Sequence, residues 1–147
     1  GQDEISVCAP TRIVTYESAS DGDGIETDLR VDRAVFDDFV IQPENYGLDR
    51  HDPSALVGGT AEENASISLR LLGGETGRKA GKTVDPALAA LHDAVVLNAA
   101  AALNVYGAVA TITEGVELVR GAIAERKPIA TLERVITATH GDAGGNG

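Results

Sequence analysis

The spacing of hydrophobic residues changes near residue 55 and divides the chain into two parts. Before that point, Thr11 to Tyr16 and Val35 to Ile41 are short runs rich in β-favouring residues, and residues 25–31 alternate apolar with polar. A period of two is typical of half-exposed strands. The segment Ser18 to Gly24 is rich in glycine and aspartate, which predicts a turn. We therefore expect a small antiparallel hairpin or meander in the first third.

After residue 55 the pattern predicts helices whose ends carry recognisable capping residues. Thr60 and Glu63 form a capping box for a helix that ends at Gly73-Gly74. Asp85-Pro86 is a typical helix start, and the helix it opens is expected to run through Tyr106 to a stop at Gly107. From residue 94 to 103 only Asn98 is polar, so we expect this helix to be buried on most sides.

Two more helices are predicted in the last third of the chain. Thr111 and Glu114 form a second capping box, and the helix that follows ends near Pro128, where another begins. Residues 141–147 contain no large apolar side chain and are expected to form a frayed tail. The expected fold class is α/β, with a strand-rich first third and packed helices after it. Residues 1–140 are expected to belong to one domain.

Composition and charge narrow the classes of function. The 147 residues carry 23 acidic and 12 basic side chains, a net charge of −11, which disfavours binding to nucleic acid. Apolar residues make up 43% of the chain, but no uninterrupted run reaches the length of a membrane span. The N-terminus does not resemble a signal peptide, so a soluble cytoplasmic protein is expected, with no membrane partner. Such strong self-repulsion also suggests adaptation to salt.

Several apparent motifs have simpler explanations. The segment Gly77 to Thr83 resembles a phosphate-binding loop, but Thr76 replaces its first glycine and a helix precedes it, so a connection between helices is expected. Asp21 to Gly24 lacks the spacing of a calcium loop and is expected to be a turn. The three histidines lack a helical pair spacing typical of zinc ligands. The single cysteine, Cys8, allows no internal disulfide and is expected to be buried and structural.

Asp3 and Glu4 are the remaining candidates for chemistry. Adjacent carboxylates supply the oxygen ligands that Mg²⁺ prefers, because this ion keeps several waters and takes only one or two protein carboxylates besides phosphate oxygens. Acidic pairs are also common on protein surfaces, where they are merely solvated. The pair is therefore compatible with either a magnesium site or an exposed surface.

Several segments, in their order and spacing, resemble the C-terminal part of anthranilate phosphoribosyltransferase. The matching segments are Gly1-Gln2-Asp3-Glu4-Ile5-Ser6, Pro10-Thr11, Pro43-Glu44-Asn45-Tyr46-Gly47-Leu48, Gly58-Gly59-Thr60-Ala61-Glu62-Glu63-Asn64-Ala65, Leu72-Gly73-Gly74-Glu75, the run from Ala94 to Leu103, and Glu114-Gly115-Val116-Glu117-Leu118. The resemblance implies part of the α/β domain of a phosphoribosyltransferase of the nucleoside-phosphorylase-like fold. It also implies transfer of a phosphoribosyl group from phosphoribosyl diphosphate to anthranilate in tryptophan biosynthesis.

The resemblance gives roles to individual residues. It implies that Asp3 and Glu4 are ligands of Mg²⁺, that no other catalytic residue lies in this chain, and that Gly58-Gly59 is a helix entry. Asn64 and Asn98 are expected to be structural, because a buried amide must find hydrogen-bond partners. Arg12 and Arg70 could contact phosphate, but a surface role is the more economical interpretation.

The chain also departs from the family pattern in ways that leave alternatives open. The glycine-rich diphosphate loop, a further magnesium ligand, the residues that contact anthranilate and the helical domain that forms the family's homodimer all lie upstream of Gly1. The segment between Glu17 and Gln42 is longer than usual, as expected for a surface insertion. We expect the chain alone to be inactive without the N-terminal half and to expose apolar surface. A related transferase with another acceptor, and a non-catalytic fragment or interaction module, are the alternatives.

Overall fold

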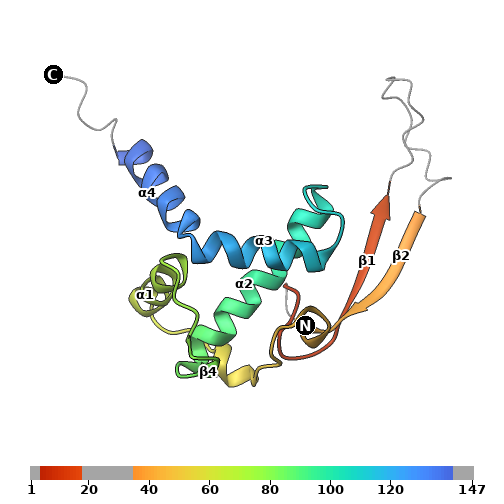
Figure 1. The fold of residues 1–147 in the computed structure, drawn as a ribbon, viewed down its shortest axis with the longest axis horizontal. Coiled ribbons are helices and arrows are strands. Elements are labelled where there is room, and N and C mark those ends of the chain that lie inside the picture. The colour runs from red at the N-terminus through yellow and green to blue at the C-terminus, as the bar shows by residue number, and fades with distance from the viewer. Residues whose placement is uncertain (1–3, 18–34, 141–147) are drawn as a thin grey trace.

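The computed structural model describes residues 4–17 and 35–140. Four of the predicted features lie outside the described residues: the turn at 18–24, the strand at 25–31, the tail at 141–147, and the first of the two candidate metal ligands, Asp3. Within the described part, a long hairpin leads into a group of helices (Figure 1).

The first third forms the predicted antiparallel hairpin. Strand β1 (Thr11–Glu17) pairs with β2 (Val35–Ile41), with Thr11 opposite Ile41. The base of the hairpin joins the body, because Ile41 is fully buried and its neighbours Ile13 and Phe39, which face each other across the ladder, pack against the core. The rest of the hairpin extends away from the helices (Figure 1).

Two short 3₁₀ helices and the first α-helix follow the hairpin. They are η2 (Pro43–Tyr46), η3 (Pro53–Leu56) and α1 (Ala61–Leu72). The predicted capping box is confirmed, because the Thr60 hydroxyl accepts from the Glu63 backbone N–H and the Glu63 carboxylate accepts from that of Thr60. The segment that resembles a phosphate-binding loop is indeed a connection between helices, which contains the two-residue strands β3 (Arg78–Lys79) and β4 (Lys82–Thr83).

Three longer helices complete the fold: α2 (Pro86–Val105), α3 (Ile112–Ala124) and α4 (Lys127–His140). The Asp85 carboxylate caps α2 as predicted. The second capping box is only half formed: Thr111 accepts from the Glu114 backbone N–H, but the Glu114 carboxylate accepts from Ala110 rather than from Thr111. Arg126, in a left-handed conformation with φ 60, turns the chain from α3 into α4.

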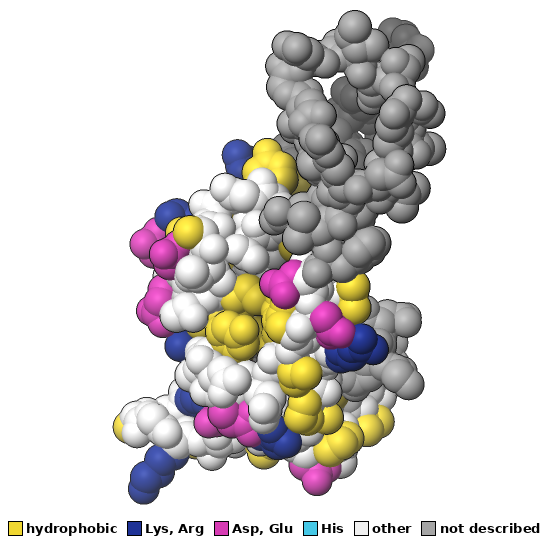
Figure 2. Space-filling model, turned by 90° about the vertical axis from the view of Figure 1, so that its right-hand side faces the viewer, with side chains coloured by type: hydrophobic (Ala, Val, Ile, Leu, Met, Phe, Trp, Pro, Cys, Tyr) yellow, Lys and Arg dark blue, Asp and Glu magenta, His cyan; other side chains and the backbone are white. Residues whose placement is uncertain are grey.

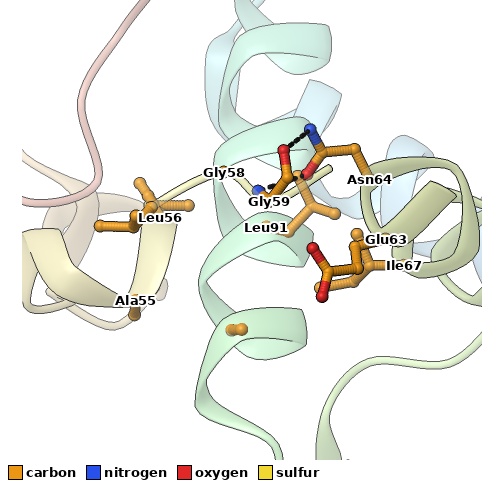
Figure 3. A pocket seen from close by; sticks show the side chains of 10 residues that line it. Ala55, Leu56, Gly58, Gly59, Glu63, Asn64, Ile67 and Leu91 are labelled. Atoms are coloured by element: carbon orange, nitrogen blue, oxygen red, sulfur yellow. Dashed lines mark hydrogen bonds between the residues drawn. The ribbon is translucent and has the colours of Figure 1, made fainter. Parts of the chain in front are cut away.

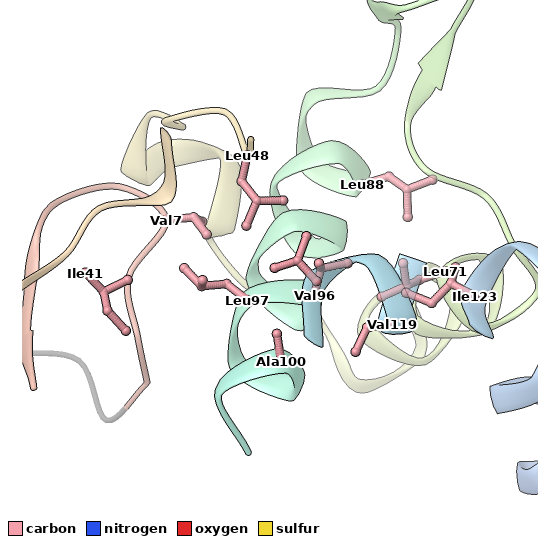
Figure 4. Close-up of a cluster of buried hydrophobic side chains, with 11 residues drawn as sticks. Val7, Ile41, Leu48, Leu71, Leu88, Val96, Leu97, Ala100, Val119 and Ile123 are labelled. Carbon is pink, nitrogen blue, oxygen red and sulfur yellow. The ribbon is translucent and has the colours of Figure 1, made fainter. Parts of the chain in front are cut away.

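Helix α2 is the centre of the molecule, and α1, α3 and η3 pack on it. Its inward side chains include Leu88, Val96 and Leu97, which meet Val7 and Leu48 from the first third and α3 side chains such as Val119 (Figure 4). Cys8 is half-buried against this core rather than fully buried. By length and composition α2 is the one helix in the described part that could cross a membrane, and in this fold it is the core helix.

Gly115 of α3 lies directly against Ala100 of α2. The two helices cross each other in Figure 1. A methyl group at this position would lie 2.8 Å from the backbone oxygen of Ala100 and 2.9 Å from its Cα. Only a residue without Cβ permits this distance, so a glycine on α3 lets the two backbones come together.

The predicted exposure of apolar surface is confirmed. Beyond Leu103 the core helix emerges from the body, so that Val105 is 81% exposed, the adjoining Tyr106 is 86% exposed, and Leu118 on α3 is about half exposed. Figure 2 shows hydrophobic side chains at the centre of one face, between polar and charged ones. A contiguous patch of exposed apolar side chains typically marks a surface that packs against another part of a protein.

Candidate functional site

The side chain of Asn98 holds the backbone that directly follows the Asp-Glu pair. Its Oδ1 accepts from the Ile5 backbone N–H at 2.9 Å, and its Nδ2 donates to the Ile5 carbonyl at 2.9 Å and to that of Ala94 at 2.9 Å. The predicted structural role of Asn98 is therefore confirmed. Because Asn98 lies in the middle of the core helix, Ile5 is tied to the central element of the fold.

Glu4 is free to act as a ligand. It is exposed, and its carboxylate forms no hydrogen bond or ion pair with the residues that the structure describes. An exposed carboxylate on a fixed backbone suits Mg²⁺, which binds one or two protein carboxylates and keeps its other positions for water and phosphate oxygens. The chemistry of this residue therefore fits the ion that the sequence predicts.

A second group of polar side chains meets at Asp93, on the buried face of α2. Asp93 is 1% exposed, and its carboxylate accepts from Arg78 Nη2 at 2.6 Å, from His51 Nε2 at 2.8 Å and from His92 Nδ1 at 2.9 Å. The backbone N–H of Asp49 adds a weaker contact at 3.3 Å. We refer to residues 49, 51, 78, 92 and 93 as the Asp93 network.

The Asp93 network is balanced without a metal ion. Ligand atoms of Asp49, His51 and Asp93 lie within 4.8 Å of one another, which is close enough for one cation. Arg78, however, already donates to both carboxylates, at 2.8 Å to Asp49 and 2.6 Å to Asp93. Its guanidinium supplies the positive charge that a metal would bring, so this arrangement is an ion-pair network rather than an open metal site.

The environment of Asp93 keeps its carboxyl ionised. Burial by itself would raise the pKa of Asp93, but the hydrogen bonds from His92, Arg78 and His51 outweigh burial and lower the pKa well below its ordinary value. As an ionised carboxylate it can only accept hydrogen bonds. Both histidines must therefore donate to it through the nitrogen that faces it.

The Asp93 network was not among the sites predicted from the sequence. Asp49, His51 and Arg78 lie 15 to 44 positions before Asp93, so no local spacing links them to it. One signal was present: an adjacent histidine and aspartate within the apolar repeat of the core helix. A charge at a core position of a helix requires a partner.

The predicted structural role of Asn64 and Gly59 is confirmed at a cavity of about 360 Å³ between η3, α1 and α2. The Asn64 side chain accepts from the Gly59 backbone N–H at 2.9 Å and donates to the Gly59 carbonyl at 3.2 Å (Figure 3). The Gly58-Gly59 segment thus forms a closed turn directly before α1. Apolar side chains such as Leu56 and Leu91 line much of the cavity.

Arg12 and Arg70 have the surface roles that were predicted for them. Arg12 pairs with Asp38 across the hairpin, and Arg70 binds Glu75 at 3.0 Å and Asp85 at 2.9 Å. These carboxylates occupy the two guanidinium groups.

Comparison with known proteins gives a consistent result. Residues 1–127 match the glycosyl transferase family, a/b domain. Anthranilate phosphoribosyltransferase of Rubrobacter xylanophilus is 35% identical over 98% of this chain and 34% of its own length. That of Thermomicrobium roseum is 40% identical over 92% of this chain and 32% of its own length. The crystal structure of the enzyme from Thermus thermophilus shares 38% identity and a TM-score of 0.56 over 69% of this chain and 29% of its own.

The chain belongs to the glycosyl transferase family, a/b domain. The relatives described above are all anthranilate phosphoribosyltransferases, and the chain spans about a third of their length. The fold agrees with the expected α/β domain of the nucleoside-phosphorylase-like type, with a short hairpin followed by packed helices.

Proposed function

We propose that this chain is the C-terminal part of the α/β domain of an anthranilate phosphoribosyltransferase, which transfers a phosphoribosyl group from phosphoribosyl diphosphate to anthranilate in tryptophan biosynthesis. The sequence match to enzymes of this name, which extends over 98% of the chain, carries the proposal. The exposed apolar end of α2 supports it, since a segment that packs against the rest of a larger enzyme would have such a surface.

In this proposal Asp3 and Glu4 hold Mg²⁺. The reaction leaves negative charge on a departing diphosphate, and a magnesium ion at these carboxylates would supply the positive charge that stabilises it. The described part of the chain contributes position: Glu4 directly precedes Ile5, whose backbone Asn98 binds at both its N–H and its carbonyl. The backbone next to Glu4 would thus be held in place before the substrate binds.

A chimeric enzyme would test this proposal. Residues 1–147 would replace the corresponding third of the Rubrobacter xylanophilus enzyme, and the fluorescence of anthranilate would be followed after addition of phosphoribosyl diphosphate and Mg²⁺. We expect the fluorescence to fall with the chimera and to stay constant with this chain alone. In the chimera, Asp3→Asn and Glu4→Gln should lower the rate at least about tenfold, because each removes one charge-assisted ligand.

Glu133→Gln is the matched control, because it makes the same change at an exposed position on α4. A folded chimera with no activity toward anthranilate would overturn the proposal. Activity on another acceptor would then favour a related transferase, and none on any acceptor would favour a non-catalytic module.

A further inference from the structure

Two arginines and a histidine from three different elements line a second cavity. The cavity measures about 270 Å³ and lies between α2, α3 and the segment after α1. Arg78 comes from β3, His92 from α2 and Arg120 from α3, and no aspartate or glutamate of the described residues lines the cavity. In a chain of net charge −11, the charged side chains that line this cavity are both arginines.

His92 presents one unused nitrogen to this cavity. The residue is 6% exposed, and its Nδ1 lies 2.9 Å from the ionised carboxylate of Asp93, to which it must donate. In the neutral ring Nε2 therefore carries a lone pair. Nε2 has no partner in the described part of the chain, where every fully buried side-chain nitrogen and oxygen has one. His92 lines the cavity, and Nε2 is its ring nitrogen that remains available to a ligand there.

Arg120 brings positive charge that is only weakly compensated. Its Nη2 donates to the Gly47 carbonyl at 2.6 Å, and its nearest carboxylate, that of the exposed Glu117, is 3.6 Å from Nη1. Most of its five N–H groups are therefore free to donate. The charge of Arg78 is balanced by Asp49 and Asp93, but its three hydrogen bonds leave some of its guanidinium N–H groups free to donate. The cavity thus offers several donors and one acceptor.

We propose that this cavity binds inorganic phosphate. An oxyanion would accept hydrogen bonds from Arg120 and Arg78, and the acceptor at His92 Nε2 selects an ion that also has a proton to donate. Hydrogen phosphate keeps one hydroxyl at pH 8. Phosphate monoesters, whose second pKa is about 6, have lost theirs at that pH, and sulfate has none. The site is therefore expected to prefer free phosphate to either, and this preference does not depend on the proposed transfer to anthranilate.

Histidine side-chain ¹⁵N resonances would report binding directly. The full chain would be titrated at pH 8 in low-chloride buffer with phosphate, sulfate and ribose 5-phosphate in parallel. We expect phosphate to shift the His92 Nε2 signal to saturation. Sulfate and ribose 5-phosphate should need about tenfold higher concentrations, since neither has a proton to donate to Nε2 of His92 at this pH.

Variants of Arg120 would locate the site. Arg120→Gln should weaken phosphate binding about tenfold or more, because a hydrogen bond to a charged group is lost. Arg120→Lys, which keeps the charge, should restore part of it, and Arg134→Gln on α4 should change nothing. Circular dichroism would confirm that each variant is folded. The proposal is wrong if phosphate leaves the His92 signal unmoved, if all three anions act alike, or if Arg120→Gln and Arg134→Gln bind phosphate equally.

Discussion

Arg78 Nη2 lies 2.6 Å from Oδ2 of Asp93, a carboxylate that is almost completely removed from water. A buried charge depends on its partner far more than an exposed one does, because removal of the partner leaves it without compensation. The buried Arg78–Asp93 pair is therefore expected to contribute more to stability than an exposed pair such as Arg70–Glu75.

We predict that Arg78→Gln destabilises the chain by about 3–5 kcal/mol, because it leaves the buried Asp93 charge without its arginine partner, which makes the shortest contact to it. Arg70→Gln makes the same change in an exposed pair and should cost no more than about 1 kcal/mol. Urea unfolding of both variants measures the difference. Equal effects would show that the Asp93 network contributes nothing beyond surface pairing.

Acid should destabilise the fold. The pKa of Asp93 is lower in the folded chain than in the unfolded one, so its contribution is present above the unfolded pKa of about 4 and is lost as the pH falls toward the folded value. We expect the free energy of unfolding to decrease steadily below about pH 4. Asp38→Asn, at an exposed pair, should retain most of this decrease, whereas Arg78→Gln should reduce it. A pH-independent stability between pH 5 and 2 would contradict the assignment.

Asn98→Ala should release the segment that follows the Asp-Glu pair. It removes the amide that binds Ile5 at both backbone groups, and we expect a loss of about 1–3 kcal/mol. Hydrogen exchange at the Ile5 amide should become markedly faster. Asn104→Ala is a matched control, since Asn104 lies near the C-terminal end of α2 and binds the carbonyls of Val109 and Ala110, far from Ile5 in the sequence. If both variants leave the exchange of Ile5 unchanged, Asn98 does not anchor this segment.

Two glycines on the same helix should respond oppositely to a methyl group. Gly115→Ala places its Cβ 2.8 Å from the Ala100 oxygen and should cost about 1–3 kcal/mol by forcing α2 and α3 apart. Gly121 faces open space, so Gly121→Ala should stabilise the protein by about 0.5–1 kcal/mol through helix propensity. Thermal unfolding of the two variants gives the sign directly. A stabilising Gly115→Ala would refute the close approach.

Local signals in the sequence were enough to place most of the elements. The hydroxyl of Thr60, the carboxylate of Asp85 and the ring of Pro128 each act within one helical turn, so their positions mark helix ends independently of the rest of the fold. The Glu114 carboxylate shows the limit of such signals, because Ala110 and Thr111 are both within its reach and the sequence does not choose between them.

Contacts between residues far apart in the chain were harder to predict from the sequence. Asn98 was recognised as structural because an amide in an apolar helix needs partners, but the identity of its partner, 93 positions earlier, depends on the packing of the whole domain. The convergence of His51 and Arg78 on Asp93 likewise depends on how distant segments pack against α2. Asp3 lies outside the described residues, so its role stays a prediction.

A carboxylate has about four lone-pair directions, and Asp93 meets donors from Asp49, His51, Arg78 and His92. Its bonding capacity is full, so no partner can be replaced without leaving an orphaned donor or acceptor elsewhere. Changes within the Asp93 network should therefore be non-additive, with the second substitution costing far less than the first. Over evolutionary time we expect these five positions to be exchanged as a set, since any intermediate with one member altered passes through a less stable protein.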